Sequence, residues 1–258
     1  MNKLAINTVG DELEASAEFC RGHGIGLEVD DFAFPLNLDG DMTEMIKRHA
    51  VATAGISPLS LHGPFLDLIA TSPDPAILEV CRKRHRAALY AAGEIGATLY
   101  VAHTNFNPLI RNGDYVKNFT KRMLDFWLPL ADDAAKSRIV ICFENLWEPG
   151  PELQVELISA AAHPNLKASF DNGHALVFSA RPAKYWIETL GLNLVHCHLH
   201  DNSGEFDEHN PVAEGKENWP ELLDAAEKFS PEAIFVAESD YLEKNKLSLQ
   251  RLRNLSSR

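Results

Sequence analysis

Short runs rich in β-branched and aromatic residues alternate along the whole chain with longer segments in which apolar residues recur at helical spacing. The short runs predict strands at 3–8, 25–29, 58–63, 97–103, 138–144, 166–171, 193–200 and 233–238. The longer segments predict helices near 11–22, 41–54, 74–95, 113–136, 151–162, 181–190, 218–229 and 241–253. Proline and glycine stand at the joints, as in "SPDP", "HPNL" and "FSPEA", so strands and helices are predicted to alternate from end to end.

Eight predicted strands, each followed by a predicted helix, in 258 residues are typical of an α/β fold of the (β/α)8 TIM barrel type. A doubly wound open sheet also alternates, but it normally has about five to seven strands and a glycine-rich first turn. The first turn here, "TVGDE", lacks that pattern, and "GHGIG" at 22–26 precedes a strand, so we interpret it as a turn. We therefore expect residues 1–258 to form a single TIM barrel domain, with its active site at the C-terminal ends of the strands.

The composition is that of an ordinary globular protein, with 45% hydrophobic and 24% charged residues. The formal net charge of −13 disfavours nucleic acid or an anionic membrane as a partner, although bound metal ions could still attract a phosphorylated molecule. The cysteines (Cys20, Cys81, Cys142 and Cys197) form no Cys-x-x-Cys pair and are expected to be free thiols. No apolar run is long enough for a transmembrane helix and "MNKLAINTVGDELE" turns acidic too early for a signal peptide, so we expect a cytoplasmic protein.

Six consecutive predicted strands end on side chains that can bind a metal. These are His62, His103, Glu144, Asp171 with His174, the stretch "LVHCHLHDNSG" at 194–204, and Glu238. Any one of them alone would more often be an ordinary strand-end residue. Because strand side chains alternate between faces, six together predict polar tips that converge at one mouth above an apolar barrel interior. Clustered carboxylates and imidazoles without a lysine or arginine need cations, which indicates divalent metal.

The loop after the seventh predicted strand offers two further ligand types. Asp207 and His209 lie two residues apart in "SGEFDEHNPVAEG", a spacing that puts both on one side of an extended segment. Taken alone, the loop would be an exposed acidic segment. Beside the strand-end cluster, we interpret the pair as ligands.

These residues resemble the xylose isomerase-like TIM barrel superfamily, which includes endonuclease IV and the sugar phosphate isomerase/epimerase proteins. The resemblance rests on "LHGPFLDL" (61–68), "VAHT" (101–104), "FEN" (143–145), "FDNGHA" (170–175), "HLHDNSGEFDEH" (198–209) and "AES" (237–239). It implies a central metal site at Glu144, Asp171, His198 and Glu238. The endonuclease IV-like branch implies additional ligands at His62, His103, His174, Asp207 and His209. The resemblance thus implies one to three divalent ions per chain, with zinc or manganese as the metals expected.

The sequence departs from both specialised branches. Ketose epimerases tend to carry an arginine soon after the strand 7 histidine, whereas "DNSGEF" has none. Endonuclease IV proteins carry longer loops that grip DNA, and this chain is short in those loops and acidic. Phe65 and Leu66 stand where DNA-wedging residues would be expected, but "HGPF" also occurs in sugar-directed members of the superfamily.

Period two in "LVHCHLHDNSG" places His196, His198 and His200 on one face of the strand. His196 is expected to lie deepest and to pack, and His198 holds the family's ligand position. His200 and Asp201 are expected at the rim, where orienting His198 and touching substrate both stay open. Among the remaining candidates, Glu28 is interpreted as a weaker substrate contact, Asn145 and Asn172 as groups that orient ligands, and His23, His49, His85 and His163 as exposed.

The first hypothesis for the function is a metal-dependent isomerase or epimerase of a sugar, sugar phosphate or related polyol. Glu144 and Glu238 would face each other as an acid/base pair, and His174 would orient the substrate. The alternative is a multi-zinc phosphodiesterase or phosphatase of the endonuclease IV-like type, acting on a small phosphodiester rather than abasic-site DNA. A non-catalytic ligand-binding barrel is disfavoured because no ligand position is degraded. The expected partner is a small carbohydrate or phosphorylated substrate, and association into a homo-oligomer stays open.

Overall fold

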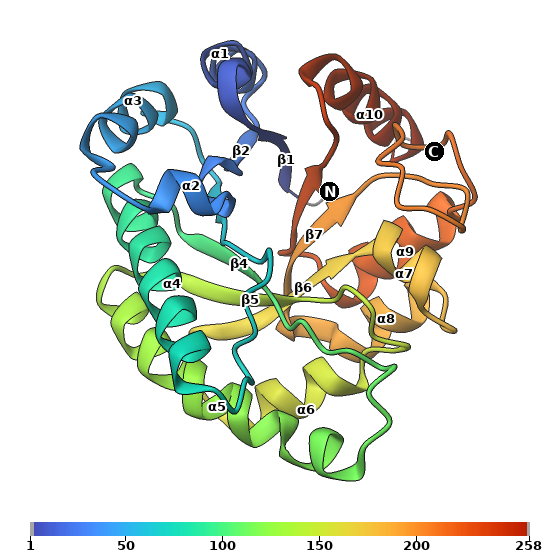
Figure 1. The fold of residues 1–258 in the computed structure, drawn as a ribbon. Coiled ribbons are helices and arrows are strands. Elements are labelled where there is room, and N and C mark those ends of the chain that lie inside the picture. The colour runs from blue at the N-terminus through green and yellow to red at the C-terminus, as the bar shows by residue number, and fades with distance from the viewer. Residues whose placement is uncertain (1–2, 257–258) are drawn as a thin grey trace.

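A computed structural model describes residues 3–256, in which eight parallel strands close into a barrel in chain order (Figure 1). The strands are β1 (Lys3–Thr8), β2 (Gly26–Val29), β3 (Leu59–His62), β4 (Leu99–His103), β5 (Val140–Glu144), β6 (Leu166–Asp171), β7 (Leu194–Leu199) and β8 (Ile234–Ala237). Each end lies within two residues of its predicted position. The predicted fold, an α/β TIM barrel of the (β/α)8 type, is confirmed.

Helices pack outside the strands, as Figure 1 shows for α4, α5 and α6 beside β4, β5 and β6. The predicted helices are α1 (Leu13–His23), α3 (Thr43–Thr53), α4 (Pro75–Ile95), α5 (Gly113–Lys136), α6 (Glu152–Ala161), α8 (Ala183–Leu190), α9 (Trp219–Phe229) and α10 (Leu242–Leu255). Two short helices were not predicted, α2 (Pro35–Leu38) and α7 (Asn172–Phe178), nor were the 3₁₀ turns η1 (Gly10–Glu12), η2 (Asp31–Ala33) and η3 (Gly191–Asn193). None of the helices within residues 3–256 combines the length and the apolar character needed to cross a membrane.

The strand register brings the predicted ligand positions to one level of the barrel. His103 on β4 is paired with Glu144 on β5, and Asp171 on β6 is paired with His198 on β7. The second pairing depends on a register shift between Ala168 and Ser169. At this shift β7 has one more residue than β6. Without that additional residue, Asp171 would lie opposite Cys197, whose side chain faces the other side of the sheet. The irregularity therefore aligns two candidate ligands.

The apolar core lies mainly between the strands and the surrounding helices, where Trp127 of α5 and Trp186 of α8 are fully buried. A small apolar layer, which includes Ala5, Cys142 and Val236, fills the barrel interior. The polar cluster lies toward the C-terminal ends of the strands. The four cysteines are buried free thiols, as expected.

Two histidines that were expected to be exposed are buried instead. His49 on α3 places its ring nitrogens 2.7 Å from the Met45 carbonyl oxygen and 3.1 Å from Asp31 Oδ2. His85 on α4 lies 2.7 Å from the Tyr100 hydroxyl and packs edge-on to the Trp127 ring. Polar partners inside the protein let these imidazoles face the core. His23 is exposed as expected, and His163 is half-buried.

Candidate metal centre

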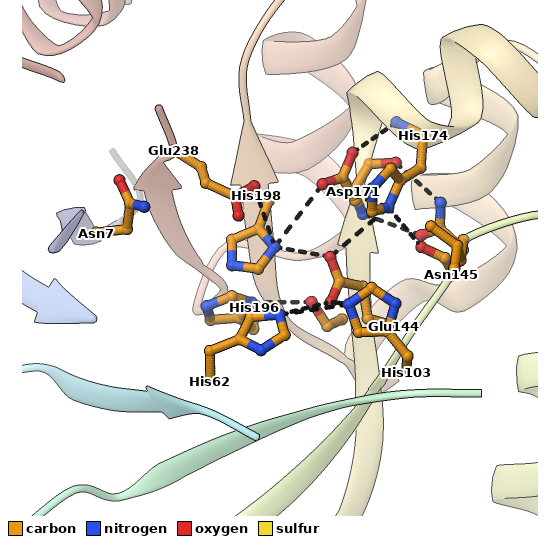
Figure 2. Close-up of polar contacts among 12 residues, drawn as sticks. Asn7, His62, His103, Glu144, Asn145, Asp171, His174, His196, His198 and Glu238 are labelled. Atoms are coloured by element: carbon orange, nitrogen blue, oxygen red, sulfur yellow. Dashed lines mark hydrogen bonds and ion pairs between the residues drawn. The ribbon is translucent and has the colours of Figure 1, made fainter. Parts of the chain in front are cut away.

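The central group surrounds one nitrogen of His198. Its Nδ1 lies 2.7 Å from Glu144 Oε1, 3.5 Å from Glu238 Oε2 and 3.8 Å from Asp171 Oδ2. Figure 2 shows the three carboxylates converging on this imidazole from β5, β6 and the residue after β8. The four residues expected to form the central metal site are therefore neighbours at the mouth of the barrel.

A second group extends from the other oxygen of Glu144. Glu144 Oε2 lies 3.0 Å from His103 Nε2 and 3.4 Å from His62 Nε2, and the two imidazole nitrogens are 3.3 Å apart. His62 Nδ1 lies 2.8 Å from the Gly63 carbonyl oxygen, to which it can donate its proton. That bond would leave His62 Nε2 free as a ligand.

A third group lies where the loop after β7 crosses the start of α7. Asp207 Oδ2 lies 3.3 Å from His174 Nε2 and 3.1 Å from His209 Nε2. His174 Nδ1 lies 2.9 Å from the Asn145 carbonyl oxygen, which can accept its proton. The second and third groups thus bring together the five additional ligand positions, and the first and second share Glu144.

The structure decides the two residues that sequence reasoning left open. His200 Nε2 lies 3.2 Å from Asp171 Oδ2, and the His200 ring stacks on His209 at 4.0 Å between centroids. His200 therefore belongs to the cluster, and a side chain at Gly173 would collide with its ring. Asp201 instead accepts hydrogen bonds from Trp219 Nε1 at 2.8 Å and from backbone amides. Of the roles left open for Asp201, these contacts favour neither: the carboxylate is fully buried and holds the loop.

Glu28, interpreted from the sequence as a weaker substrate contact, lies beneath the cluster and is fully buried. Its Oε1 lies 2.5 Å from His198 Nε2 and its Oε2 lies 2.9 Å from His196 Nε2. His196 Nδ1 lies 2.8 Å from Ser169 Oγ, so His196 is held inside the barrel as a packing residue. A proton on His198 Nε2 that is donated to Glu28 leaves Nδ1 directed at the three carboxylates.

Asn145 and Asn172 act on the backbone of the cluster residues. Asn145 exchanges two 2.9 Å hydrogen bonds with the backbone of Asp171. Asn172 donates to the His200 carbonyl oxygen at 2.9 Å and accepts from the His200 amide at 3.1 Å. Asn145 thereby ties the end of β5 to the end of β6, and Asn172 ties the end of β6 to the end of β7.

Sequence reasoning missed Asn7 and Asp30. Asn7 Nδ2 donates to Asp30 Oδ2 at 2.7 Å, while Asp30 Oδ1 is buried and makes no hydrogen bond. Burial and the nearby carboxylate of Glu28 raise the pKa of Asp30 well above its ordinary value. Period two from Glu28 would have pointed to Asp30 as the residue one level higher on the same face.

The electrostatics of the cluster fit a divalent cation. Burial opposes the charge on Glu144, but the imidazoles of His103 and His198 hold its pKa well below its ordinary value. Burial likewise opposes a proton on His62, yet the Glu144 carboxylate raises the pKa of His62 to about 9. Within residues 3–256, no lysine or arginine forms an ion pair with Glu144, Asp171 or Glu238. Glu144 Oε2 and Glu238 Oε2 are buried without a hydrogen bond, and imidazole with carboxylate is a donor set that suits zinc or manganese.

Comparisons with known proteins give the same architecture. The family model described as a xylose isomerase-like TIM barrel matches residues 17–255. The uncharacterized protein MJ1311 of Methanocaldococcus jannaschii is 26% identical over 189 residues, which are 69% of this chain and 63% of that protein. A second uncharacterized protein of that organism, MJ1614, is 27% identical over 171 residues, 62% of each chain. The chain thus spans less than two thirds of the length of these relatives.

Solved structures share the fold over nearly the whole chain. A D-tagatose 3-epimerase-like protein has a TM-score of 0.79 at 22% identity, covering 99% of this chain and 97% of its own. The TTHB071 protein from Thermus thermophilus, soaked with ZnCl2, has a TM-score of 0.79 at 23% identity over 99% and 98% of the chains. D-Psicose 3-epimerase from Clostridium cellulolyticum, with D-tagatose, has a TM-score of 0.76 at 17% identity over 98% and 99%.

Proposed function

The chain belongs to the xylose isomerase-like TIM barrel family, and from this premise we propose that it is a divalent-metal-dependent isomerase or epimerase of a sugar, sugar phosphate or related polyol. The observation that carries the proposal is the approach of three carboxylates to within 4 Å of His198 Nδ1. Structural neighbours named as ketose 3-epimerases make sugars the first substrates to test. Zinc and manganese are the first metals to test.

Glu144, Asp171, His198 and Glu238 would hold the central ion. A divalent ion bound there supplies polarisation of a substrate carbonyl and a template for adjacent oxygens. Glu144 and Glu238 reach the site from β5 and from the end of β8, so a substrate between them would meet a carboxylate on each side. One glutamate would remove a proton from carbon and the other would return one, while His174 orients a substrate hydroxyl.

The test is isotope exchange during incubation of the protein, purified without chelator, with a panel of ketoses and ketose phosphates in D2O. We expect deuterium at a substrate carbon, detected by NMR, because a shuttled proton exchanges with solvent. Glu144→Gln and Glu238→Gln should each abolish the exchange. Glu243→Gln, an exposed glutamate on α10, is the matched control and should leave it unchanged. Absence of carbon–deuterium exchange across the panel, with metal bound, would refute the isomerase.

The third group supports a second candidate, a multi-metal phosphodiesterase or phosphatase. A one-metal isomerase has no need for Asp207 between His174 and His209, nor for His62 and His103 on Glu144. Two or three ions at these groups would activate water and stabilise a leaving oxygen. One metal per chain favours isomerisation. Two or three metal ions per chain favour the hydrolase if the protein also hydrolyses bis(p-nitrophenyl) phosphate and the Asp207→Ala/His209→Ala variant does not.

A further inference from the structure

An apolar groove lies beside the metal centre, between the loops that follow β3, β4 and β5. Its volume of about 460 Å³ falls within the range of small-molecule sites. Four large apolar side chains that line it are exposed: Leu66 (47%), Ile69 (48%), Ile110 (42%) and Trp147 (38%). Exposed apolar side chains gathered in one concave surface indicate a binding site, whereas single ones do not.

The polar groups in the groove are largely engaged by the loops themselves. Asn105 Nδ2 donates to the Leu68 carbonyl oxygen at 2.7 Å, which ties the loop after β4 to the loop after β3. The Asn107 amide donates to the Tyr115 hydroxyl at 2.9 Å, and Asn107 Oδ1 accepts from the Leu109 amide at 2.9 Å. These bonds hold the walls in place before anything binds.

The charge of the groove excludes a phosphate group. In the described part of the chain, no lysine or arginine lines it, and its one carboxylate is Asp67. An anion placed there would leave water without gaining a cationic partner. The groove therefore suits a neutral and apolar group.

Phe65 connects the groove to the metal centre. Its ring stacks on His103 at 4.6 Å with an interplanar angle of 20°, and meets His62 edge-on at 5.4 Å. The same side chain lines the groove. A molecule whose polar end reaches His62, His103 and Glu144 would therefore continue past Phe65 onto an apolar wall.

We propose that this groove is a subsite for a neutral, ring-bearing apolar part of the substrate, joined to the polyol that the metal centre would hold. The inference rests on the proposed function, and it narrows the substrate to a glycoside or a similar conjugate. Free sugars would leave the groove empty, and a phosphate would find no partner in it.

The experiment compares phenyl β-D-glucopyranoside with methyl β-D-glucopyranoside by ligand-observed NMR titration of the protein purified without chelator. We expect the phenyl probe to bind roughly tenfold more tightly, because its ring leaves water. Ile110→Ser and Trp147→Ala should each bring the two affinities within about twofold while leaving metal content unchanged. Leu192→Ser is the control, because Leu192 is 78% exposed in η3, ahead of β7 at the opposite end of the barrel.

Equal binding of the two probes to the wild type would overturn the subsite, as would a phenyl preference that survives both groove variants. Self-association that Trp147→Ala abolishes, without any phenyl preference, would overturn it in favour of a second copy of the chain. If the wild type prefers the phenyl probe and the groove variants lose that preference, the subsite is supported. The absence of deuterium exchange into any sugar would then refute only the isomerase. Deuterium exchange into free ketoses without any phenyl preference refutes only the subsite.

Discussion

At the scale of single residues, Glu28 determines which nitrogen His198 offers to the mouth of the barrel. Its carboxylate lies against Nε2 of both His196 and His198, and all three side chains are fully buried. Burial opposes the charge on Glu28, but the two imidazoles hold its pKa well below its ordinary value. A charged acceptor in this place favours the His198 tautomer whose Nδ1 can bind metal.

The Glu28→Gln variant tests this role. An amide keeps the shape but removes the charge and one acceptor, so we expect metal affinity to fall roughly ten- to a hundredfold. Competition with a chromophoric chelator measures the affinity. Glu243→Gln should retain the wild-type value, and an unchanged affinity in Glu28→Gln would contradict the role of Glu28.

For single residues, the sequence predicted which face of a strand a side chain takes, but not its height in the barrel. Period two correctly put His196, His198 and His200 on one face, and strand ends pointed to Glu144 and Asp171. The pattern could not say how high each side chain lies along the barrel axis. Height depends on register, including the shift between Ala168 and Ser169, which involves contacts between strands and not the sequence of one strand. Asp30, which lies one level above Glu28 on the same face, was therefore missed.

At the scale of elements, the packing of α4 on β4 places His85 in the core. Helical spacing through Cys81, His85, Ala88 and Ala92 marks this face as buried, and only the residue type suggested exposure. Burial lowers the pKa of His85 from 6.5 to about 3. Below pH 6.5, His85 is therefore protonated in the unfolded chain, whereas in the folded chain it stays neutral until about pH 3.

His85 should thus reduce stability as the pH falls, by about 1.4 kcal/mol per pH unit between its unfolded and folded pKa values. Urea unfolding of metal-free protein at pH 7 and pH 5 measures the loss. We expect His85→Gln to lose less stability over this interval than the wild type, whatever its stability at pH 7. The exposed His23→Gln should behave as the wild type does. Equal losses for His85→Gln and the wild type would show that His85 does not act this way.

The loop between β7 and α9 is the element that sequence least determined. Asp201 anchors it through Trp219 Nε1 at 2.8 Å, and backbone bonds of 2.9 Å in each direction pair Asp201 with Asn210. This anchor positions the segment that carries Asp207 and His209. Such hydrogen bonds join residues far apart in a loop, and no periodic pattern reports them.

Asp201→Asn tests the anchor. The amide turns one acceptor into a donor that faces N–H groups, so we expect the free energy of unfolding to fall by about 1–3 kcal/mol. Metal bound at the third group should weaken more than metal at the central group. Urea unfolding and metal titration measure the two effects. Asp224→Asn, at an exposed position of α9, provides the matched control. Wild-type stability in Asp201→Asn would argue against the anchor.

At the scale of the whole molecule, the barrel was predictable because its order follows from alternation alone. Eight β-rich runs separated by amphipathic segments leave few ways to bury both faces of a parallel sheet. Closing the barrel then brings residues from positions 28 to 238 to one end, which explains why strand ends predicted most of the cluster. The short helices α2 and α7 lie in loops, whose structure the alternation of strands and helices does not predict.

The same closure concentrates buried carboxylates, so metal should stabilise the entire fold. Glu144 and Asp171 are buried, and Glu144 Oε2 makes no hydrogen bond. A ligand at about 100 times its dissociation constant adds about 2.7 kcal/mol to the folded state. For a chain of this size, that corresponds to a rise in Tm of roughly 5–10 °C.

We expect EDTA followed by dialysis to lower the Tm by this amount, and added zinc or manganese to restore it. Calorimetry measures the shift, and Glu144→Gln should lose most of its response to metal because it lacks the carboxylate shared by two groups. An unchanged Tm after chelation, together with no response to zinc, manganese, cobalt or magnesium, would mean that the imidazoles alone balance the carboxylates, and would refute both metal-dependent functions.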